Sequence, residues 1–311
     1  MIDVARLAGV AVGVVGGDRR EVLLCSALVR EGARVRAVGY PDLPELAGIT
    51  RVATVAEAVD GVQVVLAPMS NTDEAGRIRS VLQPGVELYL DEAGLSRLPP
   101  GTPLLIGYAR PVIRDLARKL RLRLVELAEQ DNIAILNSIP TAEGALLLAF
   151  QEMPITIHGS SCFVLGFGRC GVTLGRDLRA LGARTVVFAR NPAQLARAEE
   201  MGLIPRPLGE LAERAAEADC VFNTIPAPVL TRQVLAGMRR EALVVDLASP
   251  PGGTDFAAAE ELGLKAILAP GLPGKVAPAT AGAILARTVP DLIARLLSQE
   301  GGGGEANGPD R

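Results

Sequence analysis

The 311-residue sequence has little of several residue types from which common active sites are built. It contains one histidine, His158, so a zinc site made of imidazole ligands is not expected. Its four cysteines, Cys25, Cys162, Cys170 and Cys220, show no CxxC spacing, which favours reduced core thiols over a metal site. Cys170 is a partial exception, because a thiolate is favoured at the helix start that we expect there.

Excess charge and long hydrophobic runs are absent too. The formal net charge is −3 and the pI about 5.5, so nothing favours binding to nucleic acid or to an anionic membrane surface. No uninterrupted apolar run approaches the roughly 18 residues that a membrane-spanning helix needs. The N-terminus shows no export-type cleavage pattern. We therefore expect a soluble cytoplasmic protein.

What the sequence does have is a glycine-rich turn between an apolar run, residues 162–165, and an amphipathic helical pattern. The turn reads Gly166, Phe167, Gly168, Arg169, Cys170 and Gly171. Strand, glycine turn and helix are the context of a dinucleotide fingerprint. Gly166 allows the tight turn, Gly168 lets the backbone approach a pyrophosphate, and Gly171 lets the helix pack on the strand. The alternative is a glycine-rich turn that binds nothing.

Strand and helix patterns alternate along the chain, which predicts mostly parallel, doubly wound sheets. In the first half we expect strands at 10–15, 34–39, 62–67, 104–106, 122–127 and 133–136, with helices at 21–30 and 112–120. In the second half we expect strands at 162–165, 184–189, 219–223, 242–247 and 264–268, with helices at 172–181, 192–201 and 230–238. The predicted fold class is α/β, with two doubly wound Rossmann-like domains and a cleft between them.

Two helices are expected to connect these domains. Pro140 stops any preceding element, and Thr141 is expected to cap a crossover helix that continues through Phe150. We predict a substrate-binding domain at 1–140, completed by a return helix at 279–298, a cofactor domain at 141–278 and a disordered tail at 299–311.

Ligands of doubly wound sheets bind outside the carboxyl ends of the strands, and the second domain has polar residues there. Arg190 follows a strand about twenty residues beyond the glycine turn, where arginine suits the 2′-phosphate of NADP and an acidic residue suits NAD. The further cofactor contacts expected are Asn223, Thr224, Ile225, Pro226, Asp246, Ala248, Ser249, Pro270 and Gly271. Asn and Asp at strand ends also form turns, and Arg190 is also interpretable as a solvated surface residue, so these alternatives stay open.

The strands of the first domain end in polar clusters at residues 16–20, 68–72, 107–110 and 137–138. None of them is a second pyrophosphate fingerprint, so we expect this domain to bind the substrate. Arginines and hydroxyls suit a small carboxylated molecule, although turns and helix caps are the alternative for each cluster. His158 precedes the fingerprint strand, where a hinge or packing role is expected, so a lactate-type mechanism is disfavoured.

Eight motifs in order resemble the family formed by the A subunits of dipicolinate synthase, over about residues 10–297. They lie at 16–20, 137–144, 157–160, 166–171, 223–226, 246–249, 251–256 and 269–278. Pro250 and the loop at 107–111 depart from the family pattern.

The resemblance implies NADP-dependent oxidation of dihydrodipicolinate, or of its hydrated tetrahydro form, to pyridine-2,6-dicarboxylate, with NAD as the other possible acceptor. It also implies a partner, the flavoprotein-like B subunit of dipicolinate synthase, together with a homo-oligomer and a place in the mother cell of a sporulating bacterium. From their positions we expect Glu143 to be the base, with Asp18 second. The expected substrate contacts are Arg20, Ser70, Asn137, Ser138 and Thr141.

Two other functions are compatible with parts of this sequence. The chain is interpretable as a cofactor-binding scaffold or sensor that controls the flavoprotein, because it shows no unmistakable acid/base pair. A folate-type methylene dehydrogenase shares the two-domain plan, but the first domain lacks a credible catalytic lysine: the chain's only lysines are Lys119, Lys265 and Lys275.

Overall fold

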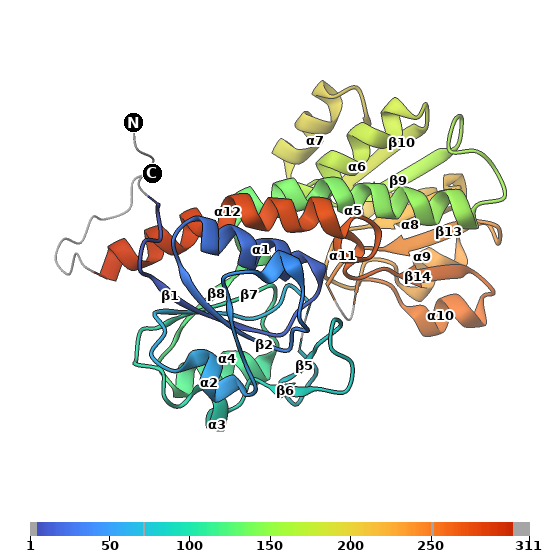
Figure 1. Cartoon of the computed structure of the whole chain (residues 1–311). Coiled ribbons are helices and arrows are strands. Elements are labelled where there is room, and N and C mark those ends of the chain that lie inside the picture. The colour runs from blue at the N-terminus through green and yellow to red at the C-terminus, as the bar shows by residue number, and fades with distance from the viewer. Residues whose placement is uncertain (1–4, 71, 250–251, 301–311) are drawn as a thin grey trace. The chain divides into compact units, whose positions relative to one another are not determined.

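The structure, a computed structural model, describes residues 5–70, 72–249 and 252–300. The chain divides into two compact units: unit 1 consists of Met1–Ile133 and Pro278–Arg311, and unit 2 of Ala134–Ala277. Each unit is built on a six-stranded parallel sheet with helices (Figure 1). The predicted fold class, α/β with two doubly wound domains, is confirmed. The tail predicted to be disordered begins at Gln299. Residues 301–311 lie outside the described residues, and Gln299 itself lies in the last described helix, Pro278–Glu300.

Unit 1 alternates strands and helices around the sheet order β3-β2-β1-β4-β7-β8, and the order reverses between β1 and β4. Its strands are β1 (Ala11–Val15), β2 (Arg34–Val38), β3 (Thr50–Val52), β4 (Val64–Leu66), β7 (Pro103–Ile106) and β8 (Arg123–Glu126), with a separate antiparallel hairpin of β5 (Arg77–Arg79) and β6 (Glu87–Tyr89). Its helices are α1 (Arg19–Arg30), α2 (Val55–Val59), α3 (Glu92–Leu95), α4 (Pro111–Lys119) and α12 (Pro278–Glu300), with 3₁₀ turns at Pro44–Leu46 and Leu127–Glu129.

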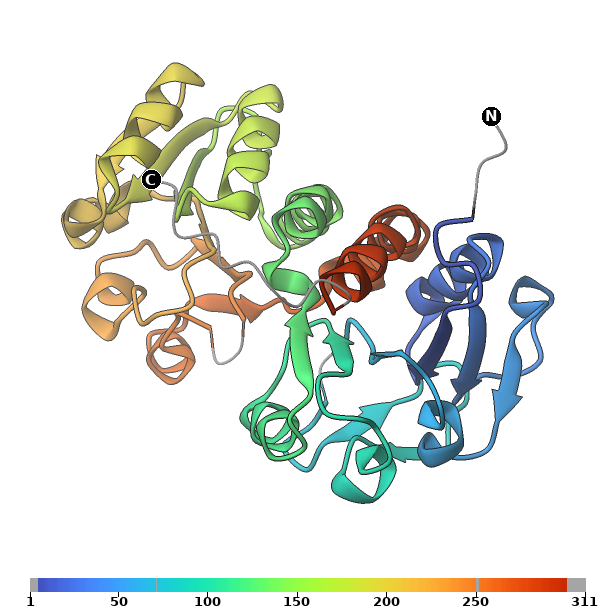
Figure 2. The same ribbon diagram turned by 90° about the vertical axis from the view of Figure 1, so that its left-hand side faces the viewer.

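Helices cover both faces of this sheet, as a parallel sheet requires. Figures 1 and 2 show α1 and α12 on one face, where Leu28 and Val289 join one core cluster. The two helices approach closely at Gly282, where an added Cβ would lie 2.7 Å from Leu23 Cδ1. Helices α2, α3 and α4 cover the other face, where Ala58 and Ile113 join a second cluster. Helix α12 therefore belongs to the core of unit 1.

Unit 2 repeats the scheme with the order β11-β10-β9-β12-β13-β14, which reverses between β9 and β12. Its strands are β9 (Ser161–Leu165), β10 (Arg184–Ala189), β11 (Ile204–Pro207), β12 (Cys220–Asn223), β13 (Leu243–Asp246) and β14 (Lys265–Leu268). Its helices are α5 (Asp131–Glu152), which begins in unit 1, α6 (Arg169–Ala180), α7 (Pro192–Glu200), α8 (Leu211–Arg214), α9 (Arg232–Ala236), α10 (Phe256–Glu261) and α11 (Leu272–Val276), with 3₁₀ turns at Leu208–Glu210 and Ala215–Glu217.

The two faces of the unit 2 sheet carry separate cores. Helices α5, α6 and α7 bring Ala142, Leu174 and Ala198 to one of them. Helices α8, α9 and α10 cover the other, where Phe163 and Phe188 pack with ring centroids 4.9 Å apart. The carboxyl edge of the sheet is left to loops.

The strand predicted at 133–136 and the cap predicted at Thr141 are both wrong, because α5 runs unbroken through Pro140. A short apolar run does not by itself distinguish a strand from a buried helix. Proline removes one helical hydrogen bond, and hydroxyl groups add bonds in the affected turns. Ser138 Oγ donates to the Ile135 carbonyl at 2.6 Å, and Thr141 Oγ1 donates to the Asn137 carbonyl at 2.8 Å.

Helix α5 is also more apolar than the sequence interpretation allowed. Among the described helices it is the one whose length and hydropathy would permit a membrane crossing. Its small residues Ala142, Ala145 and Ala149 are, however, buried in the core of unit 2. This packing accounts for the composition of its inner face.

Candidate nicotinamide and substrate sites

The turn at residues 166–171 joins β9 to α6 at the carboxyl edge of unit 2, beside the point where strand order reverses. Gly166 has a φ of +85°, which permits the turn. A Cβ on Gly171 would lie 2.1 Å from the Gly166 carbonyl oxygen, so only glycine lets α6 start this close to β9. At Gly168, the N-cap of α6, an added Cβ would meet nothing within 4 Å.

The N-terminus of α6 is consequently open. None of the described side chains caps it, and the first N–H groups of a helix have no intrahelical acceptor. A twelve-residue helix that points such groups into open space is suited to bind an anion. The turn therefore has the geometry that a pyrophosphate needs: Gly166 makes the turn and Gly171 the close packing, as predicted, and the contact of Gly168 with a pyrophosphate stays a prediction.

The loop after β12 packs on this turn. A Cβ on Gly166 would lie 2.6 Å from Thr224 Oγ1 and 2.9 Å from Ile225 Cγ1. Thr224 holds this position through its N–H and its hydroxyl, which donate to the Leu165 carbonyl at 2.9 and 2.8 Å. Thr224 and Ile225 thus lie next to the predicted pyrophosphate position, and Pro226 follows on the surface.

Asn223 and Asp246 are fully buried and bond to each other, with Nδ2 of Asn223 3.0 Å from Oδ1 of Asp246. The Asp246 carboxylate also accepts from the Ala248 and Gly253 N–H groups and from Thr254 Oγ1. These bonds belong to the loops that frame the site, so the turn-forming alternative describes both side chains. Direct cofactor contact by them stays a prediction.

A pocket of about 330 Å³ opens beyond the carboxyl end of β10. It is lined by Arg190, Leu208, Gly209, Leu211, Ala212, Val229 and Val234. Arg190 is exposed and makes no hydrogen bond or ion pair with any residue that the structure describes. Apolar walls suit a flat base, and an unpaired guanidinium suits a phosphate.

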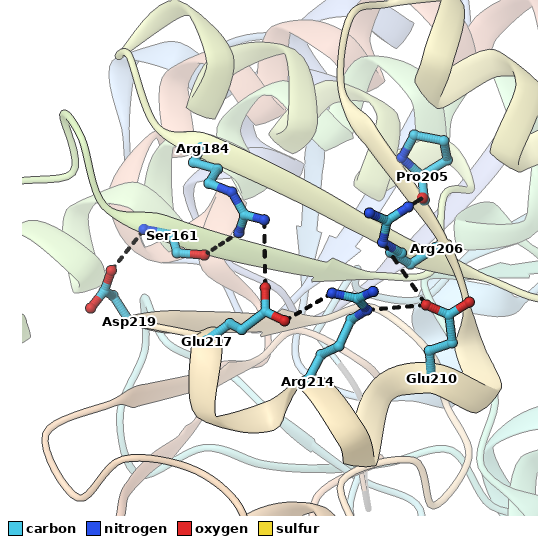
Figure 3. Close-up of polar contacts among 8 residues, drawn as sticks. All are labelled: Ser161, Arg184, Pro205, Arg206, Glu210, Arg214, Glu217 and Asp219. Atoms are coloured by element: carbon cyan, nitrogen blue, oxygen red, sulfur yellow. Dashed lines mark hydrogen bonds and ion pairs between the residues drawn. The ribbon is translucent and has the colours of Figure 1, made fainter.

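Ion pairs hold the segment that forms one wall of this pocket. Figure 3 shows Arg214 between two carboxylates, with Nε 3.1 Å from Glu210 and Nη1 2.9 Å from Glu217. Arg184 donates to Ser161 Oγ at 3.1 Å and also reaches Glu217, which connects the segment to β9 and β10. The segment that carries the pocket-lining residues Leu208 and Leu211 is therefore fixed by these ion pairs.

The remaining predicted cofactor residues differ in exposure. Phe167 and Ala248 are buried, Arg169 is partly exposed in the first turn of α6, and Ser249, Pro270 and Gly271 are exposed. Burial raises the pKa of Cys170 to about 12, which fits the reduced core thiol favoured from the sequence and not the thiolate weighed against it. Pro250, a departure noted in the sequence, lies outside the described residues.

In unit 1 the start of α1 repeats the geometry of α6 with different chemistry. Gly16 has a φ of +63° after β1, and Gly166 has a φ of +85° after β9. At the N-cap and at the third helical position, unit 1 has Asp18 and Glu21 where unit 2 has glycines. Asp18 accepts from the Arg20 N–H at 2.9 Å and pairs with the Arg20 guanidinium, whose Nη2 is 2.8 Å from Oδ2. The helix start is thus filled by the chain's own carboxylates.

Glu21 is buried and bonds across the reversal of strand order. Its Oε2 accepts from the Asp18 N–H and its Oε1 from the Met69 N–H after β4, both at 2.8 Å. Burial and the neighbouring Asp18 charge raise the pKa of Glu21 to about 7, although the Arg20 charge opposes the shift. Sequence reasoning missed this residue; the signal was the Asp-x-x-Glu spacing of a capping box.

The predicted substrate residues of unit 1 are largely engaged by the protein. Burial raises the pKa of Asp18, but its bonds to Arg20 outweigh this and leave it below the ordinary value, so Asp18 is a weak base. Arg20 has its Nε and Nη2 on the same carboxylate. Ser70 differs, because its hydroxyl is buried and has no hydrogen-bond partner among the described residues.

On α5, the predicted residues also have different surroundings. Ser138 Oγ lies 2.6 Å from Thr173 Oγ1, so its hydroxyl serves the packing of α5 on α6. Asn137 Oδ1 is buried without a partner in the described part of the chain, and Glu143 is exposed. The structure gives Ser138 and Thr141 internal bonds and leaves Glu143 accessible; their substrate roles stay predictions.

His158 lies outside this carboxyl edge. It is exposed in the loop that precedes β9, at the amino end of the strand, and its ring packs on Gly182. This position fits packing and does not fit an acid/base role.

Residues 144–249 match the family model of the D-isomer specific 2-hydroxyacid dehydrogenase NAD binding domain. The matched span contains the open glycine turn and Arg190. Unit 2 is therefore the nicotinamide-dinucleotide-binding domain of an oxidoreductase.

The family follows from the whole chain. Residues 11–128 match the model of the N-terminal domain of the dipicolinate synthase A subunit. The A subunit of dipicolinate synthase in Bacillus subtilis (strain 168) is 40% identical over 296 residues, which cover 95% of this chain and 99% of the relative. The chain belongs to the family of dipicolinate synthase A subunits, and the predicted resemblance is confirmed.

Solved structures agree with this membership. The crystal structure of the dipicolinate synthase A subunit from Bacillus halodurans matches with a TM-score of 0.87 and 40% identity, over 93% of this chain and 99% of that one. The transhydrogenase of Sinorhizobium meliloti matches with a TM-score of 0.67 at 17% identity, over 93% and 94% of the two chains, and so shares the fold.

Two glycine substitutions separate cofactor binding from packing. In Gly168→Ala the new methyl meets no protein atom, so the thermal midpoint should stay near that of the wild type. The methyl does occupy the space that a pyrophosphate needs, so NAD(P) affinity measured by calorimetry should fall at least about tenfold. Gly171→Ala should lower the thermal midpoint as well, because its methyl collides with the Gly166 carbonyl. Unchanged cofactor affinity in Gly168→Ala would contradict the assignment.

The raised pKa of Glu21 predicts a dependence of stability on pH. The folded state keeps a proton that the unfolded chain releases above the ordinary pKa of 4.5. The contribution of Glu21 to the free energy of unfolding therefore falls between about pH 4.5 and 7, by up to about 1.4 kcal/mol per pH unit. The difference in thermal midpoint between wild type and Glu21→Gln should shift with pH across this window, in favour of the variant as pH rises.

Glu57→Gln is the matched control for that measurement. Glu57 holds the same capping-box position in α2 but is exposed, and its bonds to the Ala53 and Thr54 N–H groups lower its pKa. Its difference from wild type should stay constant above pH 5. A constant difference for Glu21→Gln as well would contradict the burial of a titrating carboxyl.

Proposed function

We propose that this chain oxidises dihydrodipicolinate, or its hydrated tetrahydro form, to dipicolinate with NADP, as the A subunit of a dipicolinate synthase in sporulation. The observation that carries the proposal is the open, uncapped N-terminus of α6 at Gly168, in a chain of this family. A catalytic role for the chain itself is supported by a complete dinucleotide cradle.

The reaction sets modest demands on the protein. Dihydrodipicolinate loses one hydride and one proton as its ring becomes aromatic, and the hydrated form also loses water. Accepting the hydride is the chemistry that a bound nicotinamide supplies. The protein has to hold two carboxylates, orient the ring and take up the proton. Aromatisation supplies driving force, so a strong base is not needed.

Glu143 is our candidate for the base. Its carboxylate is exposed and makes no hydrogen bond or ion pair with the described residues, so it is free to accept a proton. Asp18, the second candidate, is held by Arg20. The choice of Glu143 therefore rests on the exposure of its carboxylate and its lack of a partner among the described residues.

NADP is favoured over NAD by Arg190. No acidic residue ends β10, and the unpaired guanidinium of Arg190 lines the pocket beside the glycine turn. An arginine at this place binds the 2′-phosphate of NADP, whereas an acidic residue binds the ribose hydroxyls of NAD.

The partner proposed is the flavoprotein-like B subunit, since the name of the relative denotes one of several subunits of a synthase. The cytoplasm of the sporulating mother cell is the proposed location. A scaffold role without chemistry remains the second candidate. It is favoured by the engagement of Asp18 and Arg20 with each other, which leaves unit 1 without a free acid/base pair among the groups predicted there.

A turnover assay of the purified chain decides between these functions. With NADP and dihydrodipicolinate generated in place, the chain alone should form dipicolinate, followed by its ultraviolet absorbance. Glu143→Gln should lower kcat by about 10²-fold or more, the usual contribution of a general base. Glu152→Gln on the same helix, where the carboxylate pairs with Lys265, should turn over normally.

Formation of product only after the flavoprotein-like partner is added would support the scaffold role. Full kcat in Glu143→Gln would remove Glu143 as the base.

Cofactor choice has a separate test by calorimetry. The unmodified chain should bind NADP more tightly than NAD. Arg190→Asp should weaken NADP about 10- to 100-fold, because a charge-assisted bond is lost and a like charge is introduced. Arg197→Asp on α7, an exposed arginine paired with Glu200, is the control and should leave both affinities unchanged. Tighter binding of NAD by the unmodified chain would refute the preference.

A further inference from the structure

Unit 1 contains buried polar atoms that the mechanism above does not use. Ser70 Oγ, Thr72 Oγ1 and Arg110 Nε are buried and have no hydrogen-bond partner among the residues that the structure describes. Buried polar groups are nearly always bonded, so three unpaired donors in one region call for a missing acceptor. Ser70 and Thr72 follow β4, and Arg110 follows its neighbour β7.

The two loops that carry these groups touch each other. A Cβ on Gly107 would lie 2.4 Å from the Met69 carbonyl oxygen, so the loops after β4 and β7 are in backbone contact. Glu21 fixes one of them by accepting the Met69 N–H. The backbone of the loops that carry the unpaired groups is therefore fixed by contacts within the protein.

Thr72 and Arg110 line a pocket of about 620 Å³ at the carboxyl edge of the unit 1 sheet. The β5–β6 hairpin and the turn that joins its strands form the other walls, with Ile78, Ser80, Val81 and residues 84–86. The hairpin is attached to the sheet by Val81 N–H, which donates to the Gly17 carbonyl at 3.2 Å, and by Ser80 Oγ, which donates to the Gly39 carbonyl at 2.7 Å.

The charged groups in the pocket favour an anion. Asp73 Oδ1 is already occupied by the Ala75 and Arg77 N–H groups, and the Arg77 guanidinium pairs with Glu87. Thr72 is only 2% exposed, and its hydroxyl retains a free hydrogen. Arg110 is the N-cap residue of α4, but its side chain does not cap the helix, so its Nε–H is also free.

The hairpin also limits the size of the ligand. A Cβ on Gly16 would lie 2.5 Å from Ile78 Cγ2, so the hairpin covers the turn where a dinucleotide would enter this unit. The pocket is left for a small molecule. A hydroxyl and a planar guanidinium are the donors that a carboxylate accepts best.

We propose that this pocket is the carboxylate subsite of unit 1, where the Thr72 hydroxyl and the Arg110 guanidinium bind one carboxylate of the substrate. Ser70, two positions before Thr72, supplies a further unpaired hydroxyl from the same loop. The identity of the ligand, a pyridine-type dicarboxylate, rests on the proposed function; the site itself rests on the unpaired donors and the pocket. Thr72 and Arg110 lie in the polar clusters 68–72 and 107–110 that the sequence assigns to the substrate side, although only Ser70 of these three residues was named there as a contact.

Calorimetry with two product-like probes tests the subsite in the full chain. Pyridine-2,6-dicarboxylate has two carboxylates and pyridine-2-carboxylate has one. The wild type should bind the dicarboxylate more tightly. In Thr72→Val and Arg110→Gln the affinity for the dicarboxylate should fall about 10- to 100-fold. The gap, meaning the difference in affinity between the two probes, should therefore narrow. Arg118→Gln, an exposed arginine on α4 paired with Asp115, should keep the full gap.

The outcomes separate this inference from the proposed function. No binding of the dicarboxylate by wild type overturns the proposed function and this ligand together. Binding by wild type with an unchanged gap in both variants overturns the subsite alone. Thermal midpoints identify a variant that fails to fold. In that case Ser70→Ala replaces Thr72→Val, and Arg110→Lys, which keeps the charge but loses the planar guanidinium, replaces Arg110→Gln. Both replacements should lower the affinity for the dicarboxylate by a smaller factor.

Discussion

The N–H groups at the start of a helix need an acceptor, and the two units of this protein satisfy that constraint in opposite ways. Each unit has a glycine turn after its first strand and a helix that begins where strand order reverses. In unit 1 the acceptors are Asp18 and Glu21, and in unit 2 the corresponding positions are Gly168 and Gly171. In unit 1 the chain's own carboxylates thereby fill the anion position, and in unit 2 that position is left open.

The carboxylate of Glu21 connects this constraint to the substrate side. It bonds to the start of α1 and to Met69, the residue before Ser70. The loop that carries Ser70 and Thr72 is consequently set by the same buried group that fills the anion position. Because the pKa of Glu21 is raised to about 7, the hydrogen bonds between Glu21 and the N–H groups of Asp18 and Met69 depend on pH in the neutral range. Glu21 is a positioning residue, since both its oxygens are used by backbone N–H groups.

Local signals in the sequence were sufficient for the fold and the cofactor turn. The turn at Gly166 and the close packing at Gly171 could be predicted because each depends on backbone geometry within six residues, whereas the contact of Gly168 with a pyrophosphate stays a prediction. The strand expected at 133–136 was wrong because Pro140 was interpreted as a stop, whereas hydroxyls at Ser138 and Thr141 support the helix through it. Asn223 and Asp246 were recognised as important, but only tertiary contacts show that they bond to each other.

The substrate side could not be predicted in the same way. Thr72 and Arg110 are 38 positions apart, and they line one pocket only because β4 and β7 are neighbours and a hairpin closes over them. The spacing of residues along the sequence does not predict which buried donors lack a hydrogen-bond partner. Glu21 was within reach of a capping-box rule, but its second bond, to Met69, depends on strand order.

The central claim is a division of labour, with the cofactor in unit 2 and the substrate carboxylate in unit 1. Hydrogen–deuterium exchange of the full chain with each ligand alone tests it most directly. NADP should slow exchange at residues 166–171 and 208–212 and leave the β5–β6 hairpin unchanged. Pyridine-2,6-dicarboxylate should slow exchange in the hairpin and at the start of α4 and leave the glycine turn unchanged. Protection of the same unit by both ligands would contradict the account.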